Sequence, residues 1–234
     1  MTPRCREVEV AVAAAYAEKT AQYFAGARRD FVAVLKSEPC RRVLEIGCGN
    51  GDTGALALKE GACEHYAGVE LFSPAAAEAR AKVDEVVVGD IETVALPWHE
   101  ETFDALIMSE VLEHLVDPWR TLRRLHPLLA NGARVLCSSP NVSHHRVLRM
   151  LWRGEWDLDD VGVMDRTHLR WFTPKTYRML FEATGFEVEE VKSISPLTRK
   201  QRIVSALMLG RREYLFWSQI CLRGRKRSGA GGSA

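Results

Sequence analysis

The chain has 234 residues, 47% of them hydrophobic, so it can bury one core and lacks room for a second catalytic domain. Lys and Arg total 32 against 31 Asp and Glu, so no net positive field indicates a nucleic-acid partner. The cysteines are scattered, no signal-peptide pattern is visible, and no apolar run approaches the ~20 residues of a membrane span. These features predict a cytoplasmic protein with reduced thiols and no integral membrane segment.

Strands and helices are expected to alternate through most of the chain, which is typical of a parallel α/β sheet. An alanine-rich stretch from about residue 8 to 35 predicts N-terminal helices before the sheet, within residues 1–38. The predicted strands are 42–46, 66–70, 85–88, 103–108, 134–138, 186–194 and 214–222. The predicted helices are 53–60, 74–83, 118–129, 174–185 and 196–212. Proline at the first helical turn supports the helices that begin near 74, 118 and 174.

The alternation is interrupted at residues 141–170. This segment is too long for an ordinary connection, and long loops in compact domains often cover a binding site. We therefore expect a domain over 39–222 with a substrate cap or loop at 141–170. Residues 223–234 are rich in Arg, Lys, Gly and Ser and predict a disordered basic tail.

Residues 43–51, Val-Leu-Glu-Ile-Gly-Cys-Gly-Asn-Gly, predict a buried strand that enters a glycine-rich turn. Glycine permits positive φ and lets a ligand approach the backbone closely. A turn of this kind at the carboxyl end of a strand is typical of a nucleotide-type cofactor site. The Glu45 carboxylate would repel a pyrophosphate, but it suits a cationic amino group and a sulfonium. The pattern therefore favours S-adenosylmethionine (SAM).

A dinucleotide is the competing cofactor, because residues 49–54 match G-x-G-x-x-G and Glu70 follows where a ribose-binding acid belongs. Those two features do not separate the cofactors, since both carry a ribose. Glu45 and Gly47 precede the match, which places an acid in the turn. Asp90 ends the third predicted strand, where it can accept a hydrogen bond from an adenine amino group. These features, with the lack of room for a second domain, favour SAM.

Four motifs in order resemble those of class I SAM-dependent methyltransferases over about residues 20–222. They are residues 45–51, 68–70, 89–91 and 103–106, the last leading to Ser-Glu-Val-Leu-Glu-His at 109–114. The resemblance implies a Rossmann-like seven-stranded sheet flanked by helices, with an antiparallel last strand and a small cap after strand 5.

The resemblance also implies roles by position. The glycine turn holds the methionine part of SAM, the end of the second strand binds the ribose, the end of the third binds the adenine, and the residues after the fourth line the floor near the sulfonium. The cofactor-binding residues implied are Glu45, Gly47, Cys48, Gly49, Asn50, Gly51, Glu70, Leu71, Asp90, Ile91, Ser109 and Glu110.

Further stretches at 96–98, 110–118, 139–141 and 165–173 are similar to a subgroup linked to bacterial cell-surface polysaccharide and sugar assembly. This likeness implies O-methylation of a sugar or glycan hydroxyl. Because a fold does not fix a function, two alternatives stay open. One is methylation of an amine or phenolic hydroxyl on a non-sugar small molecule. The other is a SAM-binding module without turnover.

If the acceptor is an alcohol, its proton must leave during methyl transfer, and a general base contributes roughly 10²–10⁴-fold. We favour His168 as the base, with Asp165 orienting its ring and His144 as another candidate; alternatively, His168 only ties its segment to the sheet. Asp165, His144 and His168 are chemically able to bind a metal, which leaves metal assistance open, but their spacing matches no recognised metal motif and the sequence predicts no metal site. Side chains expected to contact the substrate are His145, Trp156, Arg166, Arg170 and Trp171.

Overall fold

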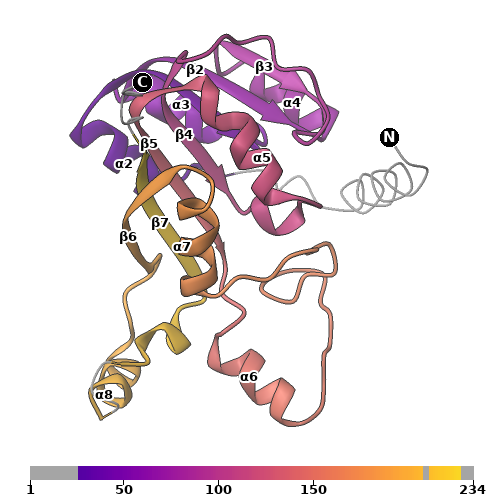
Figure 1. The fold of residues 1–234 in the computed structure, drawn as a ribbon, viewed down its shortest axis with the longest axis vertical. Helices are drawn as coiled ribbons and strands as arrows, with labels where there is room; N and C mark the ends of the chain where they lie inside the picture. The colour runs from indigo at the N-terminus through magenta and orange to yellow at the C-terminus, as the bar shows by residue number, and fades with distance from the viewer. Residues whose placement is uncertain (1–25, 208–210, 228–234) are drawn as a thin grey trace, which may run out of the picture.

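The structure is a computed structural model and describes residues 26–207 and 211–227. These residues fold around one seven-stranded sheet (Figure 1). The strand order is β3-β2-β1-β4-β5-β7-β6. Strand β7 runs antiparallel to both of its neighbours, whereas the β1–β2, β1–β4, β2–β3 and β4–β5 pairs are parallel. The Rossmann-like sheet with an antiparallel last strand is therefore confirmed. The strands are β1 (Cys40–Ile46), β2 (Cys63–Glu70), β3 (Glu85–Val88), β4 (Phe103–Ser109), β5 (Leu129–Pro140), β6 (Phe186–Ser193) and β7 (Gln219–Lys226).

Helices cover both faces of the sheet, and one further pair of helices extends from its lower end in Figure 1. The pair consists of α6, inside the predicted cap, and α8, which precedes β7. A short 3₁₀ helix, η2 (Leu112–His114), follows β4. The α-helices of the described residues are α2 (Arg29–Ser37), α3 (Asp52–Lys59), α4 (Ser73–Ala79), α5 (Pro118–Leu125), α6 (His145–Trp152), α7 (Pro174–Glu182) and α8 (Arg199–Leu207).

Two apolar clusters, one on each face, hold the helices to the sheet. Successive side chains of a strand point to opposite faces, so Leu44 and Ile46 join one cluster while Val43 joins the other. The first cluster takes up α5 and α7, and the second takes up α2 and α3. The second half of β1, from Val43 to Ile46, is thus buried on both faces. Its sequence is accordingly apolar except for Glu45.

Several predicted boundaries are wrong, and backbone chemistry explains one of them. The helix predicted to reach residue 129 ends at Leu125, because Pro127 lacks the N–H that would continue it. A 3₁₀ turn (His126–Leu128) follows, and β5 begins at Leu129 rather than at 134. The helix predicted over 196–212 begins at Arg199 and is described as far as Leu207, and the apolar residues near 214 form a 3₁₀ helix (Glu213–Phe216) before β7.

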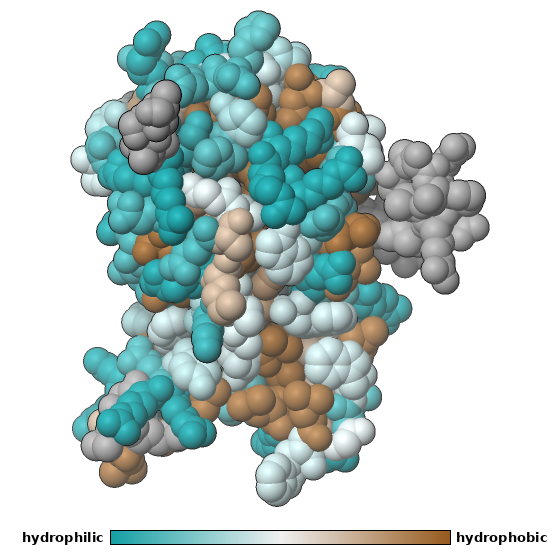
Figure 2. Space-filling view, viewed as in Figure 1, coloured by the Kyte–Doolittle hydropathy of each residue, from teal (hydrophilic) through white to brown (hydrophobic). Residues whose placement is uncertain are grey.

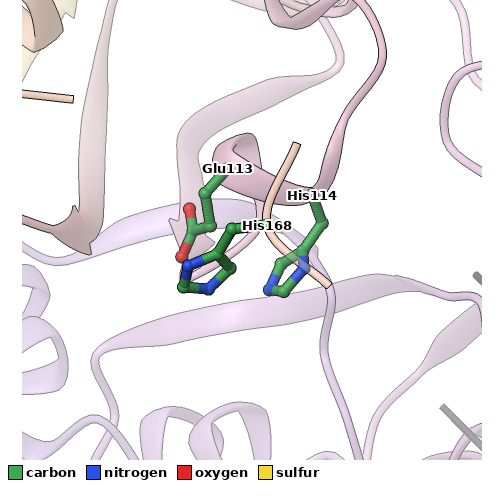
Figure 3. Close-up of side chains that lie close together, drawn as sticks. All are labelled: Glu113, His114 and His168. Carbon is green, nitrogen blue, oxygen red and sulfur yellow. The ribbon is translucent and has the colours of Figure 1, made fainter. Parts of the chain in front are cut away.

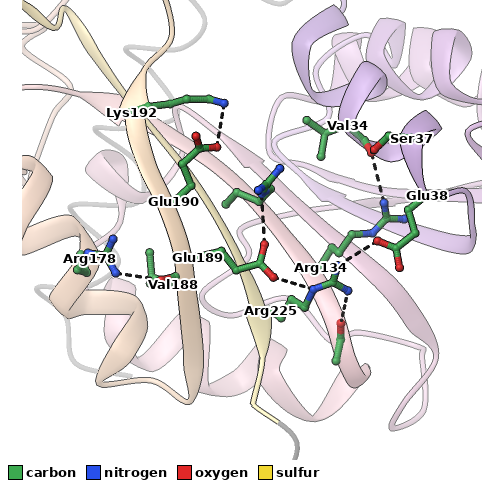
Figure 4. A network of polar contacts seen from close by, with 12 residues as sticks. Val34, Ser37, Glu38, Arg134, Arg178, Val188, Glu189, Glu190, Lys192 and Arg225 are labelled. Carbon is green, nitrogen blue, oxygen red and sulfur yellow. Dashed lines mark hydrogen bonds and ion pairs between the residues drawn. The ribbon is translucent and has the colours of Figure 1, made fainter.

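The predicted disordered tail is wrong for residues 223–226, which belong to β7. Arg225 donates to Glu189 at 2.8 Å and to Glu38 at 3.0 Å, joining three elements (Figure 4). The ammonium of Lys226 is buried and donates to the Leu129 carbonyl at 2.7 Å. Basic residues can therefore belong to the sheet here because carboxylates and carbonyls of neighbouring elements accept their hydrogen bonds. Residues 228–234, and the part of the predicted N-terminal helices that precedes residue 26, lie outside the described residues.

Two glycines with similar backbone angles offer a matched test of the cofactor turn. Gly51 has φ +80°, and a Cβ there would lie 2.9 Å from the Ala79 Cα; Gly61 has φ +66° and open space around its Cβ position. Alanine at either position incurs the left-handed strain of ~1–2 kcal/mol. We expect Gly51→Ala to lose ~1–3 kcal/mol more than Gly61→Ala because α4 backbone must also move. Urea denaturation measures both; equal losses would contradict the close packing of α3 on α4.

Candidate active site

A cavity of about 750 Å³ opens where the parallel strands end. Its walls include the residues that follow β1, the end of β2 and the turn after β4, with the segment around His168 on the remaining side. The carboxyl ends of parallel strands are where ligands bind in open α/β sheets. Most of the residues predicted to bind cofactor line it: Glu45, Gly47, Cys48, Gly49, Glu70, Leu71, Asp90, Ile91, Ser109 and Glu110. Asn50 and Gly51 do not.

The glycine turn is fixed to the end of β2 by the Glu70 carboxylate. One of its oxygens accepts from the Gly49 N–H and the other from the Phe72 N–H, both at 2.8 Å. Gly47 has φ +71°, and a Cβ there would lie 2.6 Å from a Val111 methyl. Asn50 accepts from Asp52 N at 3.3 Å, so it shapes the start of α3 behind the cavity. The turn thus exposes backbone to the cavity as its glycines predicted.

Glu45 is 3% exposed and sits in the cavity wall. Burial raises the pKa of its carboxyl to about 7, although a hydrogen bond from the Tyr66 hydroxyl at 2.8 Å opposes the rise. A cation placed beside this group would favour its ionised form. The site is therefore suited to a positively charged ligand group.

Arg28 brings a positive charge to the same cavity, and the sequence analysis missed it. Its guanidinium donates to the Ser138 hydroxyl at 2.7 Å and to the Ser109 hydroxyl, and pairs with Asp30. No motif surrounds Arg28, so only the fold places it at the strand ends. Arg28 and Glu45 thus offer the cavity a basic group and a buried acidic group, the complement of an amino acid's carboxylate and ammonium.

Glu110 has a backbone conformation that is uncommon for residues other than glycine, with φ +55°. Its N–H donates to the Ser138 carbonyl at 3.1 Å and its carboxylate accepts from the Ser138 hydroxyl at 2.7 Å. Burial raises the pKa of this carboxyl. Strained conformations of this kind cluster at functional sites, where the surroundings hold them. Here β5 holds the turn after β4 that forms the cavity floor.

The predicted base, His168, lies in the cavity wall and is 7% exposed. Its segment is docked by two hydrogen bonds, from Leu169 N at 2.8 Å and Arg170 N at 2.9 Å, to the Glu113 carbonyl. The Nδ1 of His168 lies 3.0 Å from the Val163 carbonyl, which can only accept, so Nδ1 carries the proton and Nε2 the lone pair. Asp165 accepts from Thr167 N at 2.9 Å and from its hydroxyl, and so shapes the turn that carries His168.

The other predicted acceptor-side residues lie outside the cavity lining. His144 caps α6, and burial, together with His145 and Arg146, lowers its pKa to about 4. His145 is exposed, with Nδ1 3.2 Å from the Leu215 carbonyl. Arg166 pairs with Asp160, and Arg170 donates to the Val116 carbonyl. The rings of Trp156 and Trp171 meet edge to face, with centroids 5.5 Å apart. Their roles stay predictions, to be tested on an acceptor that extends beyond the cavity.

Comparison with known proteins gives the family and the fold. A family model described as "Methyltransferase domain" matches residues 16–191. The chain is 25% identical to the "Ubiquinone biosynthesis O-methyltransferase" of Aeromonas salmonicida over 170 residues, covering 70% of this chain and 71% of that protein. The protein of the same name from Aromatoleum aromaticum is 28% identical over 168 residues, covering 68% and 70%.

A similar fold occurs in the crystal structure of an S-adenosylmethionine-dependent methyltransferase from Mesorhizobium loti. The TM-score is 0.61, with 20% sequence identity over 86% of this chain and 98% of that one. At this identity the likeness shows the fold alone. Among the described residues, no helix has the length and apolar character needed to cross a bilayer.

Glu45 makes the stability of the ligand-free chain depend on pH. Its pKa in the folded chain, about 7, lies above the usual value of 4.5. The contribution of Glu45 to the free energy of unfolding is therefore highest below pH 4.5, where the carboxyl is protonated in both states, and it falls as pH rises through 7. Between pH 5 and 8 we expect Glu45→Gln to gain stability relative to the native chain, by on the order of 3 kcal/mol at most. Urea denaturation at each pH measures the difference. Exposed Glu78→Gln is the control, and a pH-independent Glu45→Gln difference would contradict the buried acid.

Proposed function

Because the chain belongs to the methyltransferase family whose model it matches, and is a SAM-dependent methyltransferase, we propose that it methylates a hydroxyl oxygen. One observation carries the proposal. The cavity that contains the glycine turn and Glu45 also contains the buried imidazole of His168, whose Nε2 bears the lone pair. A binding site for the methyl donor and a group able to take a hydroxyl proton thus share one enclosed space.

The residues present fit SAM. Its volume suits a cavity of about 750 Å³, and Gly47, which has a left-handed backbone and a Val111 methyl against its Cβ position, brings bare backbone to the cavity wall. Arg28 and Glu45 line the cavity, and in this proposal Arg28 would bind the carboxylate and Glu45 the ammonium of the amino acid part. Glu70 would accept from the ribose hydroxyls, and Asp90 from the adenine amino group. When bound, SAM supplies an electrophilic methyl group.

The chain's own contribution to the reaction is to exclude water, orient the acceptor and receive its proton. Apolar side chains on the acceptor side of the cavity are Val111, Leu115, Val116, Val163 and Leu169. They would keep water from the reacting oxygen. The Nδ1–H bond to the Val163 carbonyl holds the His168 ring, so Nε2 can accept the hydroxyl proton without reorganisation.

We propose a sugar or glycan hydroxyl as the acceptor group. The motifs at 96–98 and 165–173 support this class, as does the Trp156–Trp171 pair on the cap. Aromatic faces outside the cavity could stack on the CH groups of a sugar chain whose end enters it. Exposed acids at Asp157 and Asp160 could accept from its hydroxyls.

A phenolic hydroxyl on an apolar molecule is the second candidate. The apolar cavity wall favours it, and the two similar proteins named above are described as acting in ubiquinone biosynthesis. A lipid-carried acceptor of either class would also suit the surface of the molecule. Helices α6 and α8, at the same end in Figure 1, expose apolar side chains between basic ones, and brown side chains are visible there in Figure 2. The exposed apolar residues are Leu148, Leu151, Trp152, Ile203, Val204 and Leu207.

Methyl incorporation identifies the acceptor class. Purified chain and SAM labelled in the methyl group are incubated with fractions of source-cell extract: nucleotide sugars, lipid-linked glycans, quinone-type lipids and small amines. We expect label in a glycan or nucleotide-sugar fraction, stable to treatments that cleave methyl esters. Label confined to the quinone fraction would select the phenolic acceptor, and label confined to amines would contradict O-methylation.

The variant His168→Ala tests the role of the imidazole. We expect turnover to fall by roughly 10²–10⁴-fold, because the hydroxyl proton loses its acceptor. Affinity for SAM, measured by calorimetry, should stay within a few-fold, since the groups placed to bind SAM lie elsewhere in the cavity. His99→Ala removes an exposed imidazole outside the site and should leave both values unchanged. Undiminished turnover in His168→Ala would rule out this role.

A further inference from the structure

Three metal-ligating side chains converge beside the cavity. Glu113, His114 and His168 each place one ligand atom within 4.8 Å of the others, and all three are buried (Figure 3). Glu113 and His114 come from η2, after β4, and His168 comes from the cap segment far along the chain. The docking of Leu169 and Arg170 on the Glu113 carbonyl brings the two elements together.

Both histidines are held in the way that metal-ligating histidines are. Nδ1 of His114 lies 3.2 Å from the Thr167 carbonyl, and Nδ1 of His168 lies 3.0 Å from the Val163 carbonyl. A carbonyl only accepts, and the Thr167 hydroxyl, 3.3 Å from His114 Nδ1, donates its own proton to Asp165. Each neutral ring therefore donates from Nδ1 and has its lone pair on Nε2. A hydrogen bond from the other ring nitrogen to a backbone carbonyl is a common support for a metal-bound imidazole. The rings meet edge to face with centroids 4.8 Å apart.

Glu113 supplies a buried acceptor that protein groups do not satisfy. It is 1% exposed, and one oxygen accepts from the Ser139 hydroxyl at 3.1 Å. Its other oxygen, Oε1, has no hydrogen-bond partner among the described residues. An unsatisfied buried carboxylate oxygen is costly, and a cation would remove the cost.

We propose that Glu113, His114 and His168 bind one divalent cation. Two imidazoles and one carboxylate suit first-row ions such as Mn²⁺ or Zn²⁺ better than Mg²⁺, which prefers oxygen ligands. Three protein ligands leave coordination positions open, and His114 and His168 line the cavity. The sequence predicts no metal site because the spacing of His168 from Asp165 and His144 matches no metal motif. The fold instead pairs it with Glu113 and His114.

The site deepens the proposed function, and its catalytic role rests on that function. A cation at this wall would bind the acceptor hydroxyl through its oxygen and make it more acidic, so that its proton would leave to solvent as the acceptor enters, before the apolar wall excludes water from the oxygen. His168 would then act as a ligand through Nε2, and the cation would take over the task of the base. Ion binding itself needs no methyl transfer, so it can be measured separately.

The test is ion binding by the full chain, freed of metal by chelation and dialysis. MnCl₂ is titrated and free Mn²⁺ is followed by electron paramagnetic resonance, with calorimetry for ZnCl₂. We expect one ion per chain and a rise in Tm on binding. Glu113→Gln and His168→Ala should each weaken binding by ~100-fold or more and abolish the rise in Tm, whereas His99→Ala should bind like the native chain.

Folding does not confound the Glu113→Gln variant, because an amide of the same shape replaces a carboxylate that lacks one partner. Its metal-free Tm should equal or exceed that of the native chain. Absence of saturable binding, or equal binding by the native chain and Glu113→Gln, would overturn the site. Full methyl transfer by demonstrably metal-free chain would overturn the catalytic role and leave the proposed function standing. A bound ion with no hydroxyl methylated in any fraction supports the site and contradicts the proposed function.

Discussion

Two backbone hydrogen bonds to one carbonyl oxygen determine the shape of the site. The Glu113 carbonyl accepts from the N–H groups of Leu169 and Arg170, and so joins the turn after β4 to the end of the cap. Without that junction the cavity at the strand ends would lack the wall that holds His168. The same contact excludes water from Glu113, which is why a carboxylate on a surface turn becomes almost fully buried. Local sheet geometry places the glycine turn, but this long-range junction encloses it.

The strand ends gather acids in a way that does not favour stability. Burial raises the pKa of Glu45, Glu70, Glu110 and Glu113, so each is costly to ionise in the ligand-free fold. Arg28 compensates part of this charge through its contacts near Glu110 and Ser138. Proteins retain such arrangements where function requires them. Glu45, Glu70 and Glu110 line the cavity, and Glu113 lies beside His114 and His168 of its wall. Acids in these places suit a sulfonium donor in the cavity and a divalent ion next to it.

The sequence predicts those parts of the molecule in which neighbours along the chain determine the structure. The run at 43–51 contains the strand, the turn and the acid, so β1 and most of the cofactor wall follow from it. The end of strand β7 was placed too early because its last residues are basic rather than apolar. Arg225 there donates to Glu189 and Glu38, partners that are distant in the chain. Arg28 and Glu113 were missed as site residues for the same reason. Each acquires its role from elements that meet only in the fold.

The hydrogen bond from His168 Nδ1 to the Val163 carbonyl serves a general base and a metal ligand equally, because both need the lone pair on Nε2. The arrangement around His168 alone therefore does not decide between them. Glu113 does, because a base mechanism gives no use to its buried oxygen, which has no hydrogen-bond partner within residues 26–207 and 211–227, nor to His114 held in the same tautomer beside it. A cation uses all three groups at once. Because one cation would engage the buried carboxylate and both imidazoles, the arrangement favours the ion as the group that activates the acceptor, with His168 as one of its ligands.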